Sequence, residues 1–316
     1  MEYLKSQNKH QIISNMKIIF GLFVLGFILL PSTTLAATIH FYSETENIYQ
    51  GDIFIVETKI SSSDKLINAA EGTIFFDKER LEVKELSSGG SLFSVWLSPP
   101  VFSNKEGEIS FIGGTPDGFH GEDALVLKII FLAKNDGEAK LDFQDNTTLF
   151  LHDGKGTQIN PWLRPFSLNI LKRPAEIPAK DEWQVLIESD KNPPEPFEIA
   201  IGRDPSIFDN QYFISFFNTD KESGIDYYEI QEGTRPYIIG DSPYLLKDQK
   251  LRSIIRVKAI DKAGNERIIE MPATYPPLPF YKTLVFWIIN VIVSVVIIIF
   301  SWFVIKRIKK KKIESG

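Results

Sequence analysis

The sequence predicts an all-β chain that holds two β-sandwich domains between a signal peptide and a transmembrane helix. Three observations predict this class. Over 38–171, short β-branched and aromatic runs alternate with turns rich in Gly, Asn, Asp and Ser. A similar pattern returns over 197–274, and one apolar segment lies near each end of the chain. Many short strands with regular turn signals are typical of β-sandwiches.

The N-terminal segment has the layout of a secretory signal peptide. Lys17 precedes an apolar run over 18–30, and small residues follow. A basic flank, a short apolar stretch and small residues are what the signal peptidase requires. We expect a signal peptide at 1–36, with an uncleaved N-terminal anchor as the alternative. Whether the chain starts at Met1 or Met16 stays open.

The first predicted domain spans 38–171. Its run Ile53–Ser61 alternates in polarity and places four side chains on one face: Phe54, Val56, Thr58 and Ile60. This period of two predicts a half-buried strand. The next run does the same with Ala70, Gly72, Ile74 and Phe76. We expect further strands at Leu81–Leu86, Ile109–Gly113, Ala124–Ala133, Glu138–Phe143, Thr148–Leu151 and Phe166–Leu171.

The run Ala124–Ala133 departs from this alternation, because it is apolar on both faces. One face would build the core. The other is either covered, as in a central strand, or forms an apolar surface on which a partner docks. In the second case the partner-binding residues would be Val126, Lys128 and Ile130, with Trp96 beside them.

A proline-rich linker is expected at 172–196, because prolines favour an extended spacer and cannot donate ladder hydrogen bonds. The second, smaller β-sandwich follows at 197–274. A stalk at 275–282 then leads to the C-terminal apolar segment.

The C-terminal segment 283–305 predicts a membrane-spanning helix. Its 23 residues reach roughly 34 Å in helical form, enough to cross a bilayer. The basic tail 306–316 fixes the orientation, because positively charged flanks stay in the cytoplasm. The sequence therefore predicts a single-pass protein of the cell membrane with most of the chain extracytoplasmic.

Composition excludes several classes of function. The formal net charge is −6; residues 1–36 carry +2, Lys282 +1 and 306–316 +5, which leaves −14 for the exterior region. Such an acidic exterior repels phosphate backbones, so no nucleic-acid partner is expected. The chain has no cysteine, which excludes disulfides and thiolate metal sites, and its four histidines are scattered.

The first domain resembles the cohesin domain, the module that docks dockerins in cellulosome scaffolds. The resemblance rests on three segments: Tyr49–Val56 with its Gly-Asp pair, Ile67–Asp77, and Leu81–Val83. Weaker matches follow at Gly107–Phe111 and at Asn146–Thr157. This resemblance implies a nine-strand jelly-roll sandwich that binds and does not catalyse. It implies a dockerin-like protein partner or, by relation to carbohydrate-binding modules, a polysaccharide.

The second domain resembles bacterial immunoglobulin-like and fibronectin-III-like modules. Ser223–Asp226 and Ala259–Asn265 carry this resemblance. It implies a spacer.

Three functions are left open by the residues. They are protein docking by the cohesin-like domain, polysaccharide binding by the same sandwich, and a purely structural role in the cell envelope. We expect no enzyme, because no paired carboxylates, catalytic triad or phosphate loop stands in a suitable context.

Residues in the turns and loops indicate two kinds of ligand contact. Trp96 and Trp162 are candidates for stacking on a sugar, although a Trp that anchors a loop to the core is the alternative. Calcium prefers carboxylate and carbonyl oxygens, and Asp145 and Asp153 supply them near one turn. Asp220, Glu222 and Asp261 are weaker candidates of the same kind, and ordinary turn chemistry is the alternative for all five.

Overall fold

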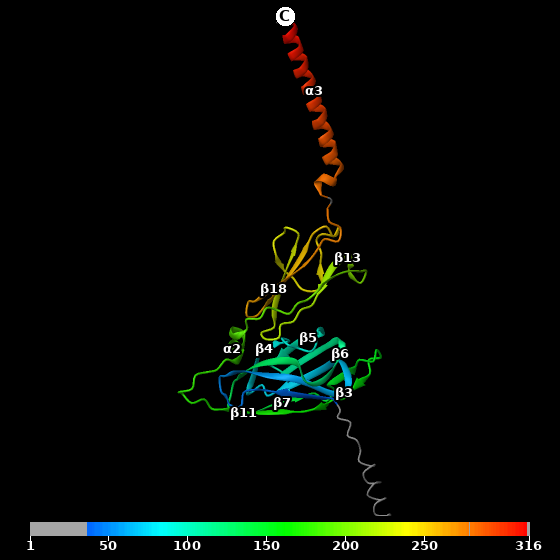
Figure 1. Cartoon of the computed structure of the whole chain (residues 1–316). Helices are drawn as coiled ribbons and strands as arrows, with labels where there is room; N and C mark the ends of the chain where they lie inside the picture. Colours follow the sequence, from blue (N-terminus) through cyan, green and yellow to red (C-terminus); the bar gives the residue numbers. More distant parts are fainter. Residues whose placement is uncertain (1–36, 278, 315–316) are drawn as a thin grey trace, which may run out of the picture. The chain divides into compact units, whose positions relative to one another are not determined.

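The structure, a computed structural model, describes residues 37–277 and 279–314, with side chains up to 308. The predicted signal peptide at 1–36 lies outside the described residues. Within them the chain forms two compact units, shown in Figure 1: unit 1 is 37–86 with 91–181, and unit 2 is 87–90 with 182–314.

Unit 1 is entirely β. Its strands are β1 (Thr38–Tyr42), β2 (Ile48–Tyr49), β3 (Ile53–Phe76), β4 (Leu81–Ser87), β5 (Val95–Ser103), β6 (Glu108–Ala133), β7 (Gly137–Phe143), β8 (Thr148–Leu151), β9 (Gln158–Ile159), β10 (Trp162–Leu163) and β11 (Phe166–Leu171). The resemblance implied nine strands. The structure has eleven, and three of these contain only two residues each.

Two long strands, β3 and β6, organise unit 1. The first half of β3 pairs with β1 and with the second half of β6. The second half of β3 pairs with β8, β7 and the first half of β6. The register shifts several times between Thr58 and Ala69. Each long strand therefore takes part in two differently paired sheet segments, which enclose the core.

The core of unit 1 follows the period of two in the sequence. All four side chains predicted on one face of Ile53–Ser61 are buried, and Ala70 and Ile74 are buried in the next run. Aromatic rings fill the centre, where Phe131 packs on Phe54 and Phe76. The all-β fold class predicted from the alternation is thereby confirmed.

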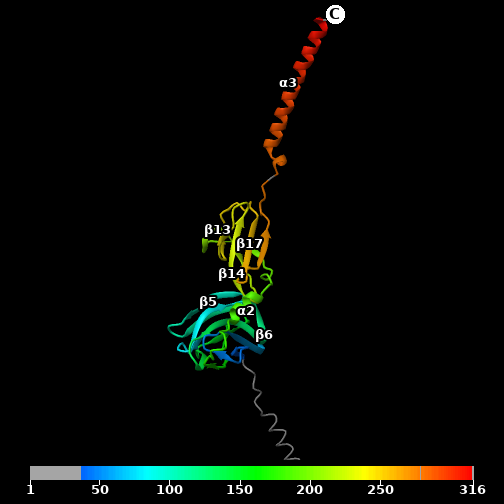
Figure 2. The same ribbon diagram turned by 90° about the vertical axis from the view of Figure 1, so that its left-hand side faces the viewer.

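Unit 2 has two small sheets around one core. One sheet has the order β12–β13–β16 and the other the order β15–β14–β17–β18. Figure 2 shows β14 and β17 side by side. The strands are β12 (Ile199–Asp204), β13 (Ile207–Phe216), β14 (Ile225–Glu232), β15 (Ile238–Ile239), β16 (Tyr244–Leu245), β17 (Ile255–Asp261) and β18 (Glu266–Met271). Their shared core centres on Ile214, Ile230, Val257 and Ala259.

Three helical segments complete unit 2. Part of 172–196, expected to be an extended linker, is the helix α2 (Glu182–Ser189). No proline lies between Pro178 and Pro193, and burial of Trp183 stabilises a helical turn there. The 3-10 turn η1 (Phe280–Lys282) precedes the long helix α3 (Leu284–Glu314). Among the described residues, α3 alone is long and apolar enough to cross a membrane.

Candidate functional site

The most accessible apolar surface of unit 1 lies on the sheet segment formed by β5, the first half of β6 and the second half of β3. Residues directly opposite each other in antiparallel strands share one face. Ser110 of β6 stands between Thr73 of β3 and Val101 of β5. Ile109 and Phe111, on either side of Ser110, point into the core. We call the solvent side the outer face, and its paired residues are Glu71, Thr73, Phe75, Val95, Ser98, Val101, Glu108, Ser110 and Ile112. We include Leu97 with them, because it is exposed at the register shift between Trp96 and Ser98.

Strand β5 forms an edge of this segment and is unusually apolar for an edge. It pairs with β6 alone. Leu97 is 83% exposed, and Val95 and Val101 are each 56% exposed. Across the segment, Phe75 of β3 is also exposed. Exposed, apolar edge strands promote association unless a partner covers them.

The structure places the predicted partner-binding residues elsewhere. Val126, Lys128 and Ile130, in the second half of β6, are buried. Leu127 and Ile129, which point to the opposite face, are buried as well. Of the two alternatives for Ala124–Ala133, the structure has the covered strand. This corrects the expectation of an open apolar surface there, because a side chain without exposed area offers no contact to a partner.

The two tryptophans singled out in the sequence differ in environment. Trp96 is half-buried and packs edge-on against Phe93 and Phe111 in the core of unit 1. Trp162, in β10, is 58% exposed, and the guanidinium of Arg164 lies 4.8 Å from its ring centre. Trp96 therefore acts as an anchor of β5, whereas Trp162 presents an accessible ring.

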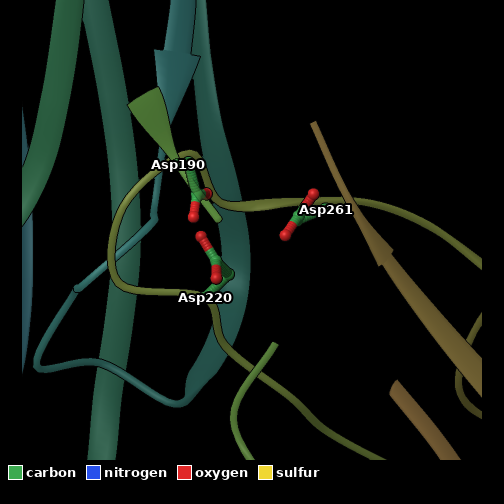
Figure 3. Close-up of side chains that lie close together, drawn as sticks. All are labelled: Asp190, Asp220 and Asp261. Carbon is green, nitrogen blue, oxygen red and sulfur yellow. The ribbon is translucent and has the colours of Figure 1, made fainter. Parts of the chain in front are cut away.

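A cluster of three buried aspartates lies in unit 2 (Figure 3). Carboxylate oxygens of Asp190, Asp220 and Asp261 lie within 4.8 Å of one another. Their residues follow α2, precede β14 and end β17, respectively. All three are at most 3% exposed. Among the described residues, this is the one group of three such side chains with the spacing of metal ligands.

Hydrogen bonds from nearby groups hold the three carboxylates in place. The backbone N–H and the hydroxyl of Ser223 both donate to Asp190. The backbone N–H of Gly224 donates to Asp220 at 2.8 Å. Asn265 donates to Asp261 from its backbone and from its side chain. The oxygens are therefore fixed before any ligand arrives.

Burial raises the pKa of Asp220 above its ordinary value. The hydrogen bond from Gly224 opposes this shift, and the charges of Asp190 and Asp261 add to it. None of the ion pairs found in the described part of the chain contains these three aspartates. A hard cation with oxygen ligands, such as calcium, would relieve the repulsion.

The calcium candidates Asp145 and Asp153 of unit 1 are not part of this cluster. Both are exposed. Asp153 accepts hydrogen bonds from the hydroxyl of Thr157 and the backbone N–H of Lys155, and these lower its pKa. Its carboxylate closes its own turn.

Of the weaker calcium candidates, Asp220 and Asp261 belong to the cluster, while Glu222 accepts a hydrogen bond from Asn192. Sequence reasoning missed Asp190, because no local pattern in the proline-rich segment distinguishes it.

The fold of part of this chain is similar to that of several proteins with solved structures. No family model and no curated protein matches the sequence. Many of the solved structures that match are cohesin modules, the family that the sequence resemblance names. One is a cohesin module of a family 33 glycoside hydrolase from Clostridium perfringens. It has 16% identity over 44% of this chain and 100% of its own, with a TM-score of 0.35.

Two further matches are of the same kind. A non-cellulosomal cohesin from the archaeon Archaeoglobus fulgidus has 20% identity over 43% of this chain and 91% of its own, with a TM-score of 0.36. A cohesin in a type I cohesin–dockerin complex of Clostridium thermocellum has 16% identity over 43% of this chain and 95% of its own, with a TM-score of 0.36. These three structures are proteins to which this chain is similar. The dockerin belongs to the Clostridium thermocellum complex alone.

Proposed function

We propose that this chain is a membrane-anchored binding protein without catalytic activity, which docks a protein partner through the outer face of unit 1. The observation that carries the proposal is the apolar edge strand β5, with Leu97 83% exposed between Val95 and Val101. Fully desolvated apolar anchors at the centre of a patch supply most of the affinity in protein interfaces. The sequence resemblance to cohesins supports a partner of the dockerin type.

The chemistry of the outer face favours a protein over other ligands. The most exposed side chains of β5 are aliphatic, while Glu71, Glu108 and Ser110 add polar groups on the neighbouring strands. An apolar centre with a polar surround is the usual anatomy of a protein interface. Apart from the exposed rings of Phe75 and Phe102, the exposed apolar side chains of this segment offer no planar face on which a sugar stacks.

We infer that unit 1 lies on the cell exterior. Helix α3 contains a 25-residue candidate membrane span, Leu284–Ile308, in which an 18-residue window has a mean hydropathy of 2.9. Lysines and an arginine follow its apolar part. By the positive-inside rule the tail at 306–316 is then cytoplasmic, and both β units lie outside.

The test is capture of a partner by purified protein and two variants. Residues 37–275 are immobilised and exposed to the surface and secreted proteins of cells that express the chain. Leu97→Asp places a charge at the centre of the proposed interface. Ile239→Asp is the matched control, because Ile239 of unit 2 is 71% exposed and aliphatic too. Buried unpaired charges at interfaces cost several kcal/mol, so we expect Leu97→Asp to lose on the order of 100-fold in affinity.

A protein retained by the parent and by Ile239→Asp, but lost by Leu97→Asp, supports the proposal. Equal retention by all three proteins would place the interface elsewhere. If no protein is retained at all, a structural role in the envelope becomes the better account.

Polysaccharide binding is the second candidate, and the exposed ring of Trp162 favours it. Aromatic faces stack on sugar rings, and Arg164 beside this ring adds hydrogen-bond donors. Trp162→Ala is expected to abolish retention on insoluble polysaccharide with no loss of thermal stability. Unchanged retention would exclude this tryptophan as the binding platform.

A further inference from the structure

Three polar side chains lie on one face of the apolar part of helix α3, residues 284–305. They are Asn290, Ser294 and Ser301, and every other residue of 284–305 is apolar or aromatic. At 100° per residue, Ser294 lies about 40° and Ser301 about 20° from Asn290 around the helix axis. The polar side chains therefore form a narrow stripe along the span.

The amide of Asn290 is only partly satisfied by its own helix. Its Nδ2 donates to the backbone carbonyl of Phe286 at 2.8 Å. That bond uses one N–H, and no group in the described part of the chain donates to its Oδ1. The hydroxyl of Ser294 donates to the backbone carbonyl of Asn290 instead. An acceptor and a donor of the amide are thus left for an outside group.

In a bilayer those two groups meet no water. Asn290 lies six residues after Leu284, which is about 9 Å along the helix and inside a hydrocarbon layer roughly 30 Å thick. Unsatisfied amide groups in hydrocarbon cost several kcal/mol, so polar residues in spans face protein partners. A partner helix at this face must offer both a donor and an acceptor.

We propose that α3 pairs with α3 of a second copy of this chain through Asn290, Ser294 and Ser301. This inference rests on the proposed membrane anchoring. An amide carries a donor and an acceptor, so two copies of Asn290 across a two-fold axis satisfy each other. The two serines are small enough for the helix backbones to approach closely. The pair would display two outer faces, which strengthens binding to a partner with repeated docking sites.

The test uses the absence of cysteine from the chain. A single cysteine introduced into full-length protein in membranes reports pairing by oxidative cross-linking. Ile297→Cys lies about 20° from Asn290 around the helix, whereas Ile299→Cys lies about 180° away. We expect cross-linked dimer from Ile297→Cys and several-fold less from Ile299→Cys. Equal cross-linking at both positions would overturn the proposed face.

Two further substitutions in the Ile297→Cys background test the role of the amide. Asn290→Leu is expected to lower the dimer yield on the order of tenfold, since hydrogen bonds between helices favour pairing by about that factor. Ile292→Leu, on the opposite side of the helix, is the matched control and leaves the yield unchanged. An unchanged yield in Asn290→Leu would overturn the proposal, as would a cross-linked product that contains a different protein.

Alkaline carbonate extraction of the same samples separates the two claims. Protein that stays in the membrane but does not cross-link overturns the pairing and leaves the anchoring intact. Protein released into the supernatant overturns the anchoring, and the pairing with it.

Discussion

Asp52 is the residue that ties the start of the first sheet to the segment that leaves it. Its carboxylate accepts hydrogen bonds from Arg173, from the backbone N–H of Lys180 and from the backbone N–H of Tyr49. Gly51 precedes it with a φ of +89°, a conformation that favours glycine. The Gly-Asp pair that carries much of the cohesin resemblance thus has a structural role in this chain.

We predict that Arg173→Ala destabilises unit 1 by about 3 kcal/mol, because it leaves the buried carboxylate of Asp52 without its charged partner. Urea denaturation measures this change. Lys105→Ala is the matched control: the side chain of Lys105 is 91% exposed in its ion pair, and its removal should cost under about 0.5 kcal/mol. Equal effects of the two variants would contradict a structural role for the Asp52–Arg173 pair.

The contribution of Asp52 also depends on pH. Burial alone would raise the pKa of this carboxyl group, but the hydrogen bonds from Arg173, Lys180 and Tyr49 lower it overall below the ordinary value of 3.8. A lowered pKa means that the folded state favours the charged form. The stabilisation is therefore complete above pH 3.8 and is lost as the pH falls through the folded pKa.

The aspartate cluster of unit 2 gives the stability of the folded state the opposite dependence on pH. Because burial and neighbouring charges raise the pKa of Asp220, its charged form destabilises the folded state as the pH rises through that value. Calcium binding stays a prediction. If the cluster binds calcium, a concentration of 100 times Kd adds about 2.7 kcal/mol to the stability of unit 2.

Thermal unfolding with calcium and with a chelator measures that effect. The calcium-dependent rise in Tm should shrink as the pH is lowered, because a proton on Asp220 competes with the cation and the raised pKa of this group favours the proton. Asp261→Asn removes one carboxylate and should abolish the rise. Asp153→Asn, at an exposed turn of unit 1, should retain it. A Tm that does not respond to calcium would show that the cluster is a structural hydrogen-bond centre.

At the scale of elements, the position of β5 depends on one close contact. A side chain at Gly113 would place its Cβ 2.6 Å from the ring of Trp96 and 2.8 Å from that of Phe93. Gly113 of β6 lies directly opposite Trp96. The glycine therefore allows the Trp96 ring to lie close against β6 and hold the edge strand.

We predict that Gly113→Ala destabilises unit 1 by about 1–3 kcal/mol, because packed cores resist added volume. Denaturation followed by tryptophan fluorescence measures the change. Ser110→Ala, on the same strand but on the solvent side, is the control and should have little effect. If Gly113→Ala were as stable as the parent, the ring would have room to move and Trp96 would not anchor β5.

The elements differ in how far the sequence predicts them. β8 and β11 coincide with their predicted ranges, because each is a short β-branched or aromatic run between turn residues. β5 was not predicted, since Pro99 and Pro100 lie inside it and argue against a strand. At an edge, however, a proline need not donate to a ladder, and β5 has a neighbour on one side only.

At the scale of the molecule, the sequence predicts the order of the parts better than the location of the site. Alternation and hydropathy act locally, so they predict two β units followed by an apolar helix. The outer face and the aspartate cluster depend on which strands become neighbours. Asp190 and Asp261 are 71 positions apart in the sequence, and nothing in the local pattern of either residue indicates the other.

Docking through the outer face is tested most directly by hydrogen–deuterium exchange of the chain with and without its captured partner. We expect slower exchange in β5 and in the adjoining parts of β3 and β6, because a docked protein would cover the free edge and the outer face. Exchange in β10, which carries Trp162, should not change. Protection confined to unit 2 or to β10, with β5 exchanging as before, would contradict docking through the outer face.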